Sequence, residues 1–244
     1  QIMAKHLLLY GANGYTGKLI IELAASYGLA PILAGRNATA IRELSEQNHL
    51  PYRVADLYSE GAIDELLKDI QVVIHAAGPF SMTAEPMIKG CIRNKVHYLD
   101  ITGEIPVFEL AKKFHTAAIG AGVMVMPGTG FDVVPTDCMA LWLKEQLPDA
   151  THLELGFTNL GGGLSHGTAT TMAQSLGEKG AIRKNGKIVP SPIGALHRLV
   201  DFGSGPWIII SIPWGDIATA YNTTGIPNII TYTGITNSMF RVLK

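Results

Sequence analysis

Residues 5–149 alternate short apolar runs with longer amphipathic segments. The apolar runs are rich in Val, Ile and Leu, as is typical of strands that are buried on both faces of a parallel sheet. The segments between them carry apolar residues at three- and four-residue spacing, which predicts helices that pack on such a sheet. The predicted strands are residues 5–11, 30–35, 52–56, 72–78, 97–103 and 122–128, and the predicted helices are residues 15–28, 38–48, 60–69, 84–95, 106–121 and 135–149.

This alternation predicts an α/β fold that begins with a Rossmann domain, a doubly wound parallel sheet, in residues 1–148. After that point the apolar runs become longer and alternate with polar residues, and Asn185-Gly186 is a strong two-residue hairpin signal. We therefore predict an α+β domain with a mainly antiparallel sheet in residues 149–244, incomplete at its C-terminus. Its predicted strands are residues 151–160, 181–192, 197–203 and 207–215, with a helix at 167–180.

The composition favours a small-molecule ligand. Nineteen basic and 20 acidic residues give a net charge of −1, so no basic surface is expected for nucleic acid. The apolar runs are too short for a transmembrane segment. Cys91 and Cys138 lie far apart in the sequence, which argues against a disulfide framework and a zinc site, so no metal is predicted. These features are typical of a cytoplasmic protein. A mean hydropathy of +0.22 also favours a large buried interface or an apolar ligand.

Three glycines follow the first predicted strand at intervals of three residues, in the order Gly11, Gly14 and Gly17. Such a loop between a strand and a helix lets the backbone approach a pyrophosphate, whose charge the helix N-terminus attracts. Here Gly11 ends the strand, Gly14 allows the close approach and Gly17 lets the helix pack on the sheet. An ordinary tight turn is the alternative. The residues predicted to bind a dinucleotide in this loop are Gly11, Asn13, Gly14, Tyr15, Thr16 and Gly17.

The end of the second strand indicates which dinucleotide binds. NAD-binding proteins usually carry an acid there for the ribose 2′-hydroxyl, whereas this chain has Arg36 followed by Asn37. The guanidinium of Arg36 can pair with a 2′-phosphate, and Asn37 can add a hydrogen bond. We therefore predict NADP (NADPH) as the cofactor. The alternative is that Arg36 is a solvated loop cation.

Two further loops are predicted to contact the cofactor. Asp56 ends the third strand, where a carboxylate commonly contacts the adenine, although it could instead cap the next helix. Ala77, Gly78 and Pro79 end the fourth strand, where the nicotinamide half is expected to lie. The alternative is that these three residues form a turn with no further role.

Hydride transfer also requires a group that manages one proton. No tyrosine has a lysine four residues later, which argues against the short-chain dehydrogenase solution. The catalytic candidates at the carboxyl edge of the sheet are Asp100 and Glu104, after the fifth strand, and Asp132, after the sixth. Alternatively, Asp100 caps a turn, Glu104 begins a helix and Asp132 ties down its loop. His166 is a further candidate from the second domain.

Several segments together resemble a known family. "GANGYTGKL", "AGRN", "HAAGPFS", "CIRNKVHYLDITGE" and "GTGFDVVPTD" are similar to the saccharopine dehydrogenase-like (saccharopine reductase-like) NADP-binding oxidoreductases, close to the trans-acting enoyl reductase branch. The later "GTATTMAQSLGEKG" and "IPWGDIATAYNTTGIPNI" are similar to the second domain of that branch. The chain departs from the pattern at Asn13, where Thr is commoner, and at Val133 and Thr136, where Ser is commoner.

The resemblance implies an NADP-dependent oxidoreductase that moves a hydride to or from a C=N or C=C bond of a small-molecule substrate. It also implies a second domain that often supports a homodimer. Two alternatives remain open. One is a non-catalytic NADP-binding or redox-sensing protein, and the other is a lipid-associated enoyl reductase.

Overall fold

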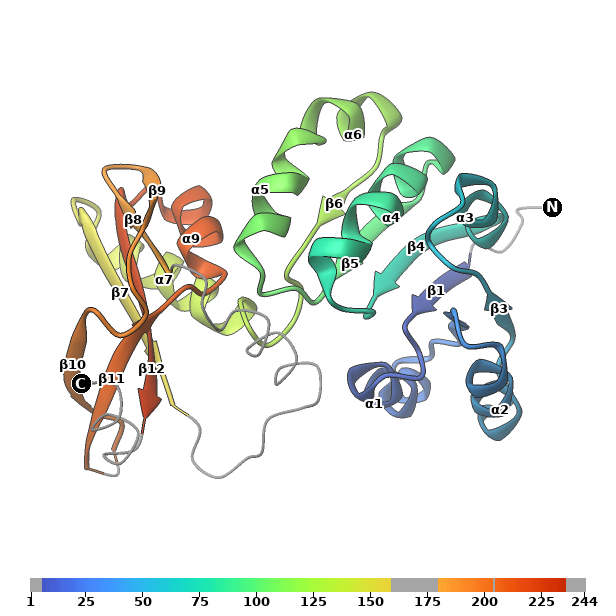
Figure 1. Ribbon diagram of the computed structural model, residues 1–244, viewed down its shortest axis with the longest axis horizontal. Coiled ribbons are helices and arrows are strands. Elements are labelled where there is room, and N and C mark those ends of the chain that lie inside the picture. Colours follow the sequence, from blue (N-terminus) through green and yellow to red (C-terminus); the bar gives the residue numbers. More distant parts are fainter. Residues whose placement is uncertain (1–5, 159–179, 204, 236–244) are drawn as a thin grey trace. The chain divides into compact units, whose positions relative to one another are not determined.

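The computed structural model describes residues 6–158, 180–203 and 205–235 (Figure 1). Contacts divide the chain into two compact units, the first ending at Gly130 and the second beginning at Phe131. This division lies before helix α7 (Val134–Gln146), because α7 packs against elements of the second unit. The boundary that we predict from the sequence, at residue 148, lies after that helix. The two units, called unit 1 and unit 2 below, are described separately.

Unit 1 contains a six-stranded sheet with the order β3-β2-β1-β4-β5-β6, in which all neighbouring strands are parallel. This topology confirms the predicted doubly wound parallel sheet. The strands are β1 (His6–Tyr10), β2 (Ile32–Gly35), β3 (Tyr52–Val54), β4 (Ile70–His75), β5 (His97–Asp100) and β6 (Val125–Met126).

Helices cover both faces of this sheet, as the strand residues require. In β1, Leu9 packs with the helices of one face, whereas Leu8 and Tyr10 pack with those of the other, which follows the two-residue period of a strand. The helices are α1 (Tyr15–Ala24), the short 3-10 helix η1 (Ala25–Tyr27), α2 (Ala38–Asn48), α3 (Glu60–Leu66), α4 (Phe80–Asn94), α5 (Ile105–Lys113) and α6 (His115–Ala121). The single helix predicted for residues 106–121 is therefore two helices that meet at Phe114.

Unit 2 contains a second six-stranded sheet around the long strand β12 (Asn228–Ile235). Its other strands are β7 (His152–Phe157), β8 (Ala181–Lys184), β9 (Lys187–Pro190), β10 (His197–Asp201) and β11 (Pro206–Ile212). Most pairs are antiparallel, as predicted, but β7 runs parallel to β12. Our placement of residues 151–160 in an antiparallel pairing is therefore wrong.

The turn between β8 and β9 confirms the predicted hairpin. Asn185 and Gly186 have φ values of 51° and 77°, which is the left-handed conformation that a type I′ turn requires at both central positions. Two elements are not among those we predict from the sequence, helix α9 (Asp216–Thr224) and strand β12. The predicted helix at 167–180 lies outside the described residues, except for Gly180.

The core of unit 2 lies where α7 and α9 pack with β7 and β12. Its buried residues are Ala140, Leu153, Leu155, Ala220, Ile226 and Ile229. Within the described parts of the chain, no helix has the length and apolar character needed to cross a membrane.

Candidate functional site

The predicted cofactor residues gather at the carboxyl edge of the sheet in unit 1. In the strand order, β1 and β4 are neighbours, and the helices that follow them pack on opposite faces. In an open parallel sheet, this topological switch point is where ligands bind, outside the carboxyl ends of the strands. The glycine loop follows β1 and residues 77–79 follow β4, so both loops lie at the switch point.

The three glycines of the loop differ in how closely the rest of the protein packs around them. Gly11 has a φ of +87°, and a Cβ there would lie 2.7 Å from the Ala76 carbonyl carbon. A Cβ at Gly17 would lie 2.5 Å from the carbonyl oxygen of Gly11. Gly14, by contrast, is exposed, has an ordinary φ of −73°, and its Cβ would meet only that same oxygen closely, at 3.2 Å. Packing within the protein therefore explains Gly11 and Gly17 better than it explains Gly14.

Helix α1 begins directly after Gly14 without a side-chain cap. Its first backbone N–H groups, from Tyr15, Thr16 and Gly17, have no intrahelical acceptor, and the Tyr15 side chain is 67% exposed. The partial positive charge of such a helix end attracts an anion. Asn13 lies beside this end, with its Oδ1 over the last residue of β2, Gly35. The loop thus fits the pyrophosphate of a dinucleotide.

Arg36, Tyr10 and Asp56 lie together at the carboxyl ends of the first three strands. Tyr10 donates a hydrogen bond to the Ala55 carbonyl oxygen over 3.0 Å. Burial raises the pKa of Tyr10 to about 12; the positive charge of Arg36 opposes this shift, and the negative charge of Asp56 adds to it. Arg36 is exposed, so its guanidinium is accessible to a ligand.

Two of the predicted cofactor residues also make local hydrogen bonds. Asn37 caps helix α2, because its Oδ1 accepts the Ala40 N–H at 3.1 Å. Oδ1 of Asp56 accepts the Tyr58 N–H at 3.0 Å, and Asp56 remains exposed. The cap of α3 is Ser59, so the alternative in which Asp56 caps that helix is wrong.

The loop after β4 contains Ala77, the exposed Gly78 and Pro79, joined by a cis peptide bond between Gly78 and Pro79. Pro79 is the N-cap residue of α4. The carbonyl oxygens of Ala77 and Pro79 both lie within hydrogen-bonding distance of the Thr83 hydroxyl, at 2.7 and 3.1 Å. Sequence reasoning missed Thr83, which has no motif of its own.

Glu104, a catalytic candidate, is bound to the start of helix α4. Its Oε1 accepts the Phe80 N–H and its Oε2 accepts the Ser81 N–H, each over 2.8 Å. Glu104 is also the N-cap residue of α5, as the alternative proposes. A carboxylate held in this way stabilises the N-terminus of α4 through charge as well as hydrogen bonding.

Asp100, the second candidate, is fully buried and accepts three hydrogen bonds. They come from the Tyr98 hydroxyl at 2.6 Å, the Thr102 N–H at 3.0 Å and the Gly128 N–H at 2.7 Å. Burial raises the pKa of Asp100, and these hydrogen bonds oppose the shift. The side chain thus ties the end of β5 to the loop after β6.

Asp132, the third candidate, belongs to unit 2 and is half-buried, which raises the pKa of its carboxyl. Its backbone carbonyl oxygen accepts a hydrogen bond from the Trp214 indole over 2.6 Å. His166 lies outside the described residues.

Sequence reasoning missed two carboxyls that lie between α7 and α9 in unit 2. Asp216 is fully buried and accepts a hydrogen bond from the Thr136 hydroxyl over 2.6 Å, and Asp137 accepts one from Thr223 over 2.6 Å. One oxygen of each carboxyl has no hydrogen-bond partner. Burial, together with the charges of Asp137 and Asp132, raises the pKa of Asp216 to about 7, although the Thr136 bond opposes this. No group of three His, Cys, Asp or Glu side chains among the described residues suits a metal ion.

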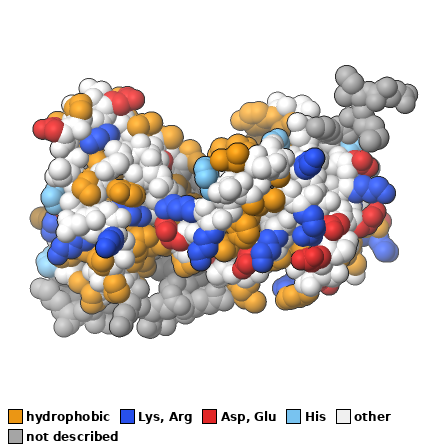
Figure 2. Space-filling model, turned by 90° about the horizontal axis from the view of Figure 1, so that it is seen from above, with side chains coloured by type: hydrophobic (Ala, Val, Ile, Leu, Met, Phe, Trp, Pro, Cys, Tyr) orange, Lys and Arg blue, Asp and Glu red, His pale blue; other side chains and the backbone are white. Residues whose placement is uncertain are grey.

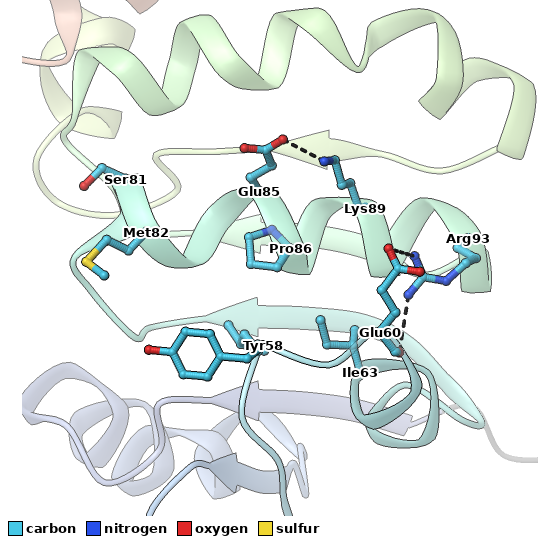
Figure 3. Close-up of a pocket in the computed structure, with 10 residues that line it drawn as sticks. Tyr58, Glu60, Ile63, Ser81, Met82, Glu85, Pro86, Lys89 and Arg93 are labelled. Carbon is cyan, nitrogen blue, oxygen red and sulfur yellow. Dashed lines mark hydrogen bonds and ion pairs between the residues drawn. The ribbon is translucent and has the colours of Figure 1, made fainter.

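A groove of about 330 Å³ lies between α3 and α4 in unit 1 (Figure 3). Its basic side chains are paired with acids: Lys89 with Glu85 at 2.8 Å, and Arg93 with Asp64 at 2.7 Å. Tyr58, Ser81 and Met82 line the groove near the carboxyl edge of the sheet. Because its charges are paired, this groove is not suited to an anion.

On the face shown in Figure 2, basic and acidic side chains are interspersed.

Residues 7–126 match the family model described as the saccharopine dehydrogenase NADP binding domain. The chain is 26% identical over 204 residues to a mouse saccharopine dehydrogenase-like oxidoreductase, covering 73% of this chain and 48% of that relative. It is 33% identical over 184 residues to a putative trans-acting enoyl reductase of Mycobacterium tuberculosis, covering 70% of this chain and 44% of that relative. The chain therefore spans less than half the length of these relatives.

The fold is also similar to that of a solved structure, the apo saccharopine dehydrogenase (L-Glu forming) of Saccharomyces cerevisiae. The TM-score is 0.67 with 20% sequence identity, and the match covers 95% of this chain and 55% of the yeast chain. At this identity the likeness supports the fold and not a shared substrate.

Proposed function

Because residues 7–126 belong to the saccharopine dehydrogenase NADP binding domain family, we propose that this chain is part of an NADP-dependent oxidoreductase. The proposed reaction transfers a hydride to or from a C=N or C=C bond of a small molecule. The observation that carries the choice of NADP over NAD is Arg36, an exposed cation at the end of β2, where an acid would repel a 2′-phosphate.

The positions of several predicted cofactor residues support a role for each of them. The N–H groups at the start of α1 bind the pyrophosphate, with Gly14 leaving room for its approach. Arg36 pairs with the 2′-phosphate and Asp56 contacts the adenosine. The loop of Ala77, Gly78 and Pro79 supports the nicotinamide half, and the bound cofactor supplies the hydride chemistry.

Of the three catalytic candidates, two are held by hydrogen bonds within unit 1, and Asp132 of unit 2 stays a prediction. The carboxyl of Glu104 accepts two backbone N–H groups, and that of Asp100 accepts three hydrogen bonds, so both are already committed to structure. Asp132 is half-buried, and burial raises the pKa of its carboxyl.

The cofactor proposal is tested by titrating the protein with NADPH and NADH, and by repeating both titrations with Arg36→Ala. We expect NADPH affinity to fall by about 10- to 100-fold, since charge-assisted hydrogen bonds are lost, and NADH affinity to change little. Arg42→Ala, at an exposed arginine in α2, is the matched control and should leave both affinities unchanged. Equal parental affinity for the two cofactors, or an unaltered preference in Arg36→Ala, would contradict the role of Arg36.

The substrate class is tested by measuring NADPH oxidation by the full-length protein. One arm offers pairs of amino acids and keto acids that form imines, and the other offers enoyl thioesters. Similarity to a putative trans-acting enoyl reductase of M. tuberculosis supports a lipid-associated enoyl reductase as the second candidate function, which the enoyl arm tests. Binding of NADPH without oxidation in either arm would favour the non-catalytic alternative. The cytoplasmic location and the homodimer stay predictions, to be tested by fractionation and by light scattering.

A further inference from the structure

His75, the last residue of β4, is a fully buried imidazole in unit 1. Its ring stacks on Tyr10 and meets Phe80 edge-on, each with ring centroids 5.5 Å apart. Its Nε2 lies 2.9 Å from the Thr83 hydroxyl, whereas its Nδ1 has no hydrogen-bond partner. Burial lowers the pKa of His75 to about 3, so the ring is neutral near neutral pH.

The contacts of Thr83 decide which atoms donate. A threonine hydroxyl carries a single proton, and the backbone carbonyl oxygens of Ala77 and Pro79 can only accept. The hydroxyl therefore donates to these oxygens, mainly to Ala77 at 2.7 Å and partly to Pro79 at 3.1 Å. Nε2 of His75 must then donate to the Thr83 oxygen. The result is a directed chain of hydrogen bonds from the end of β4, through α4, to the loop between them.

These hydrogen bonds end at a single loop, residues 77–79. Ala77 and Pro79 flank Gly78 at the switch point between β1 and β4, the place expected for the nicotinamide half of a dinucleotide. The adenosine half is expected at the ends of β2 and β3, near Arg36 and Asp56. A change at Thr83 would therefore reach one half of the cofactor and not the other.

We propose that Thr83, oriented by His75, is a positioning residue for the nicotinamide half of the cofactor. By holding the carbonyl oxygens of Ala77 and Pro79, it fixes the shape of the loop against which that half lies. This inference rests on the proposed cofactor function and adds Thr83, which no motif in the sequence marks, together with a role for His75.

The test compares two ligands and two variants. NADPH carries both halves of the cofactor, whereas adenosine 2′,5′-bisphosphate carries the adenosine half with its 2′-phosphate and no nicotinamide. In Thr83→Val, which removes the hydroxyl at nearly constant shape, we expect NADPH to bind about five- to tenfold more weakly, with affinity for the bisphosphate unchanged. Thr83→Ser keeps a hydroxyl and should restore the affinity for NADPH.

If Thr83 had a merely structural role, its loss would lower the affinity for both ligands together, because the adenosine half binds the same unit. Equal weakening of both ligands, or no change in either, therefore overturns the inference while leaving the cofactor proposal intact. Failure of the parent protein to bind NADPH overturns the cofactor proposal, and this inference with it.

His75→Phe gives a second and independent removal of the donor. Phenylalanine keeps an aromatic ring among Tyr10 and Phe80 and removes the unpartnered Nδ1, so we expect the variant to fold. NADPH should bind about two- to threefold more weakly, with the bisphosphate again unaffected, since Thr83 then loses its orienting partner. If Thr83→Val does not fold, the affinities of His75→Phe for NADPH and for the bisphosphate test the inference in the same way.

Discussion

In unit 1 the buried Asp100 accepts three hydrogen bonds, whereas in unit 2 the buried Asp216 accepts one from Thr136 and keeps an oxygen without a partner. Both carboxyls are fully buried, and in both cases burial raises the pKa. The difference lies in what surrounds them. Asp100 uses its bonds to join the end of β5 to the loops after β5 and β6, so it contributes to the shape of the carboxyl edge of the sheet.

Asp216 lies instead where two helices pack, and the nearby carboxyls of Asp137 and Asp132 disfavour its charge. A buried carboxylate with few donors and acidic neighbours is costly, so the neutral form is favoured. Hydrogen bonds stabilise the buried carboxyl of Asp100 in unit 1, whereas the buried carboxyl of Asp216 in unit 2 is stabilised in part by holding a proton. Three substitutions test this difference.

The largest effect is expected for Asp100→Ala. The substitution leaves the Tyr98 hydroxyl and the Thr102 and Gly128 N–H groups without their acceptor in a buried place, which should lower the free energy of unfolding by about 3 to 5 kcal/mol. Urea unfolding measures this change. Tyr98→Phe removes only one of the three donors and should cost about 1 kcal/mol. If Asp100→Ala cost no more than Tyr98→Phe, the three hydrogen bonds would not be what stabilises this carboxyl.

A smaller effect is expected for Asp216→Asn, and it depends on pH. Burial and the neighbouring acids raise the pKa of Asp216 to about 7 in the folded protein, above the 3.8 of an ordinary aspartate, so between these values the folded state binds more protons than the unfolded state. Its contribution to stability is therefore present below about pH 4 and is lost as the pH rises to about 7. The asparagine variant lacks this loss and should be more stable than the parent at pH 8, by on the order of 2 to 3 kcal/mol.

Chemical unfolding of parent and variant at pH 5 and pH 8 measures the effect. His75 in unit 1 has the opposite dependence, because burial lowers its pKa and stability is then lost as the pH falls below about 6.5. The difference between variant and parent therefore isolates Asp216 better than the parent curve alone. Glu145→Gln, at an exposed position of α7, is the control and should follow the parent at both pH values. An Asp216→Asn curve parallel to that of the parent would refute the protonated state.

The smallest effect is expected for Glu104→Gln in unit 1. The amide keeps one acceptor for the Phe80 and Ser81 N–H groups but loses the charge that stabilises the start of α4, which should cost about 1 kcal/mol. Thermal unfolding measures this, with Glu46→Gln in α2 as the control at an exposed glutamate. A loss of turnover of a hundredfold or more at unchanged stability would restore Glu104 as the catalytic candidate.

The sequence predicts the parts of the fold that depend on local pattern. The six strands of unit 1 follow from apolar runs, the glycine loop from its spacing, and the β8–β9 turn from Asn185-Gly186. Local sequence pattern does not predict which strands pair when the partners lie far apart in the chain. β7 has the alternation of a sheet strand, yet nothing in it indicates that its partner is β12 or that the pair is parallel.

The candidate site shows the same limit. Arg36 is visible because its position after a strand has a known meaning, whereas the contact between Glu104 and the start of α4 joins residues 24 positions apart in the sequence. His75 and Thr83 look like an ordinary strand end and helix residue until the carbonyl oxygens of Ala77 and Pro79 are placed beside them. Such roles depend on distances between loops, which local sequence patterns do not encode.

The central position of β12 has a consequence for the order in which the protein can form during synthesis. The six described strands of unit 1 have all been made once Met126 has left the ribosome, so that sheet can form early. In unit 2, β7 is made first, and its strand partner among the described residues is β12, one of the last of these segments to be made. Until then β7 has open edges, so the second sheet must fold slowly and late, with its contacts far apart in the chain.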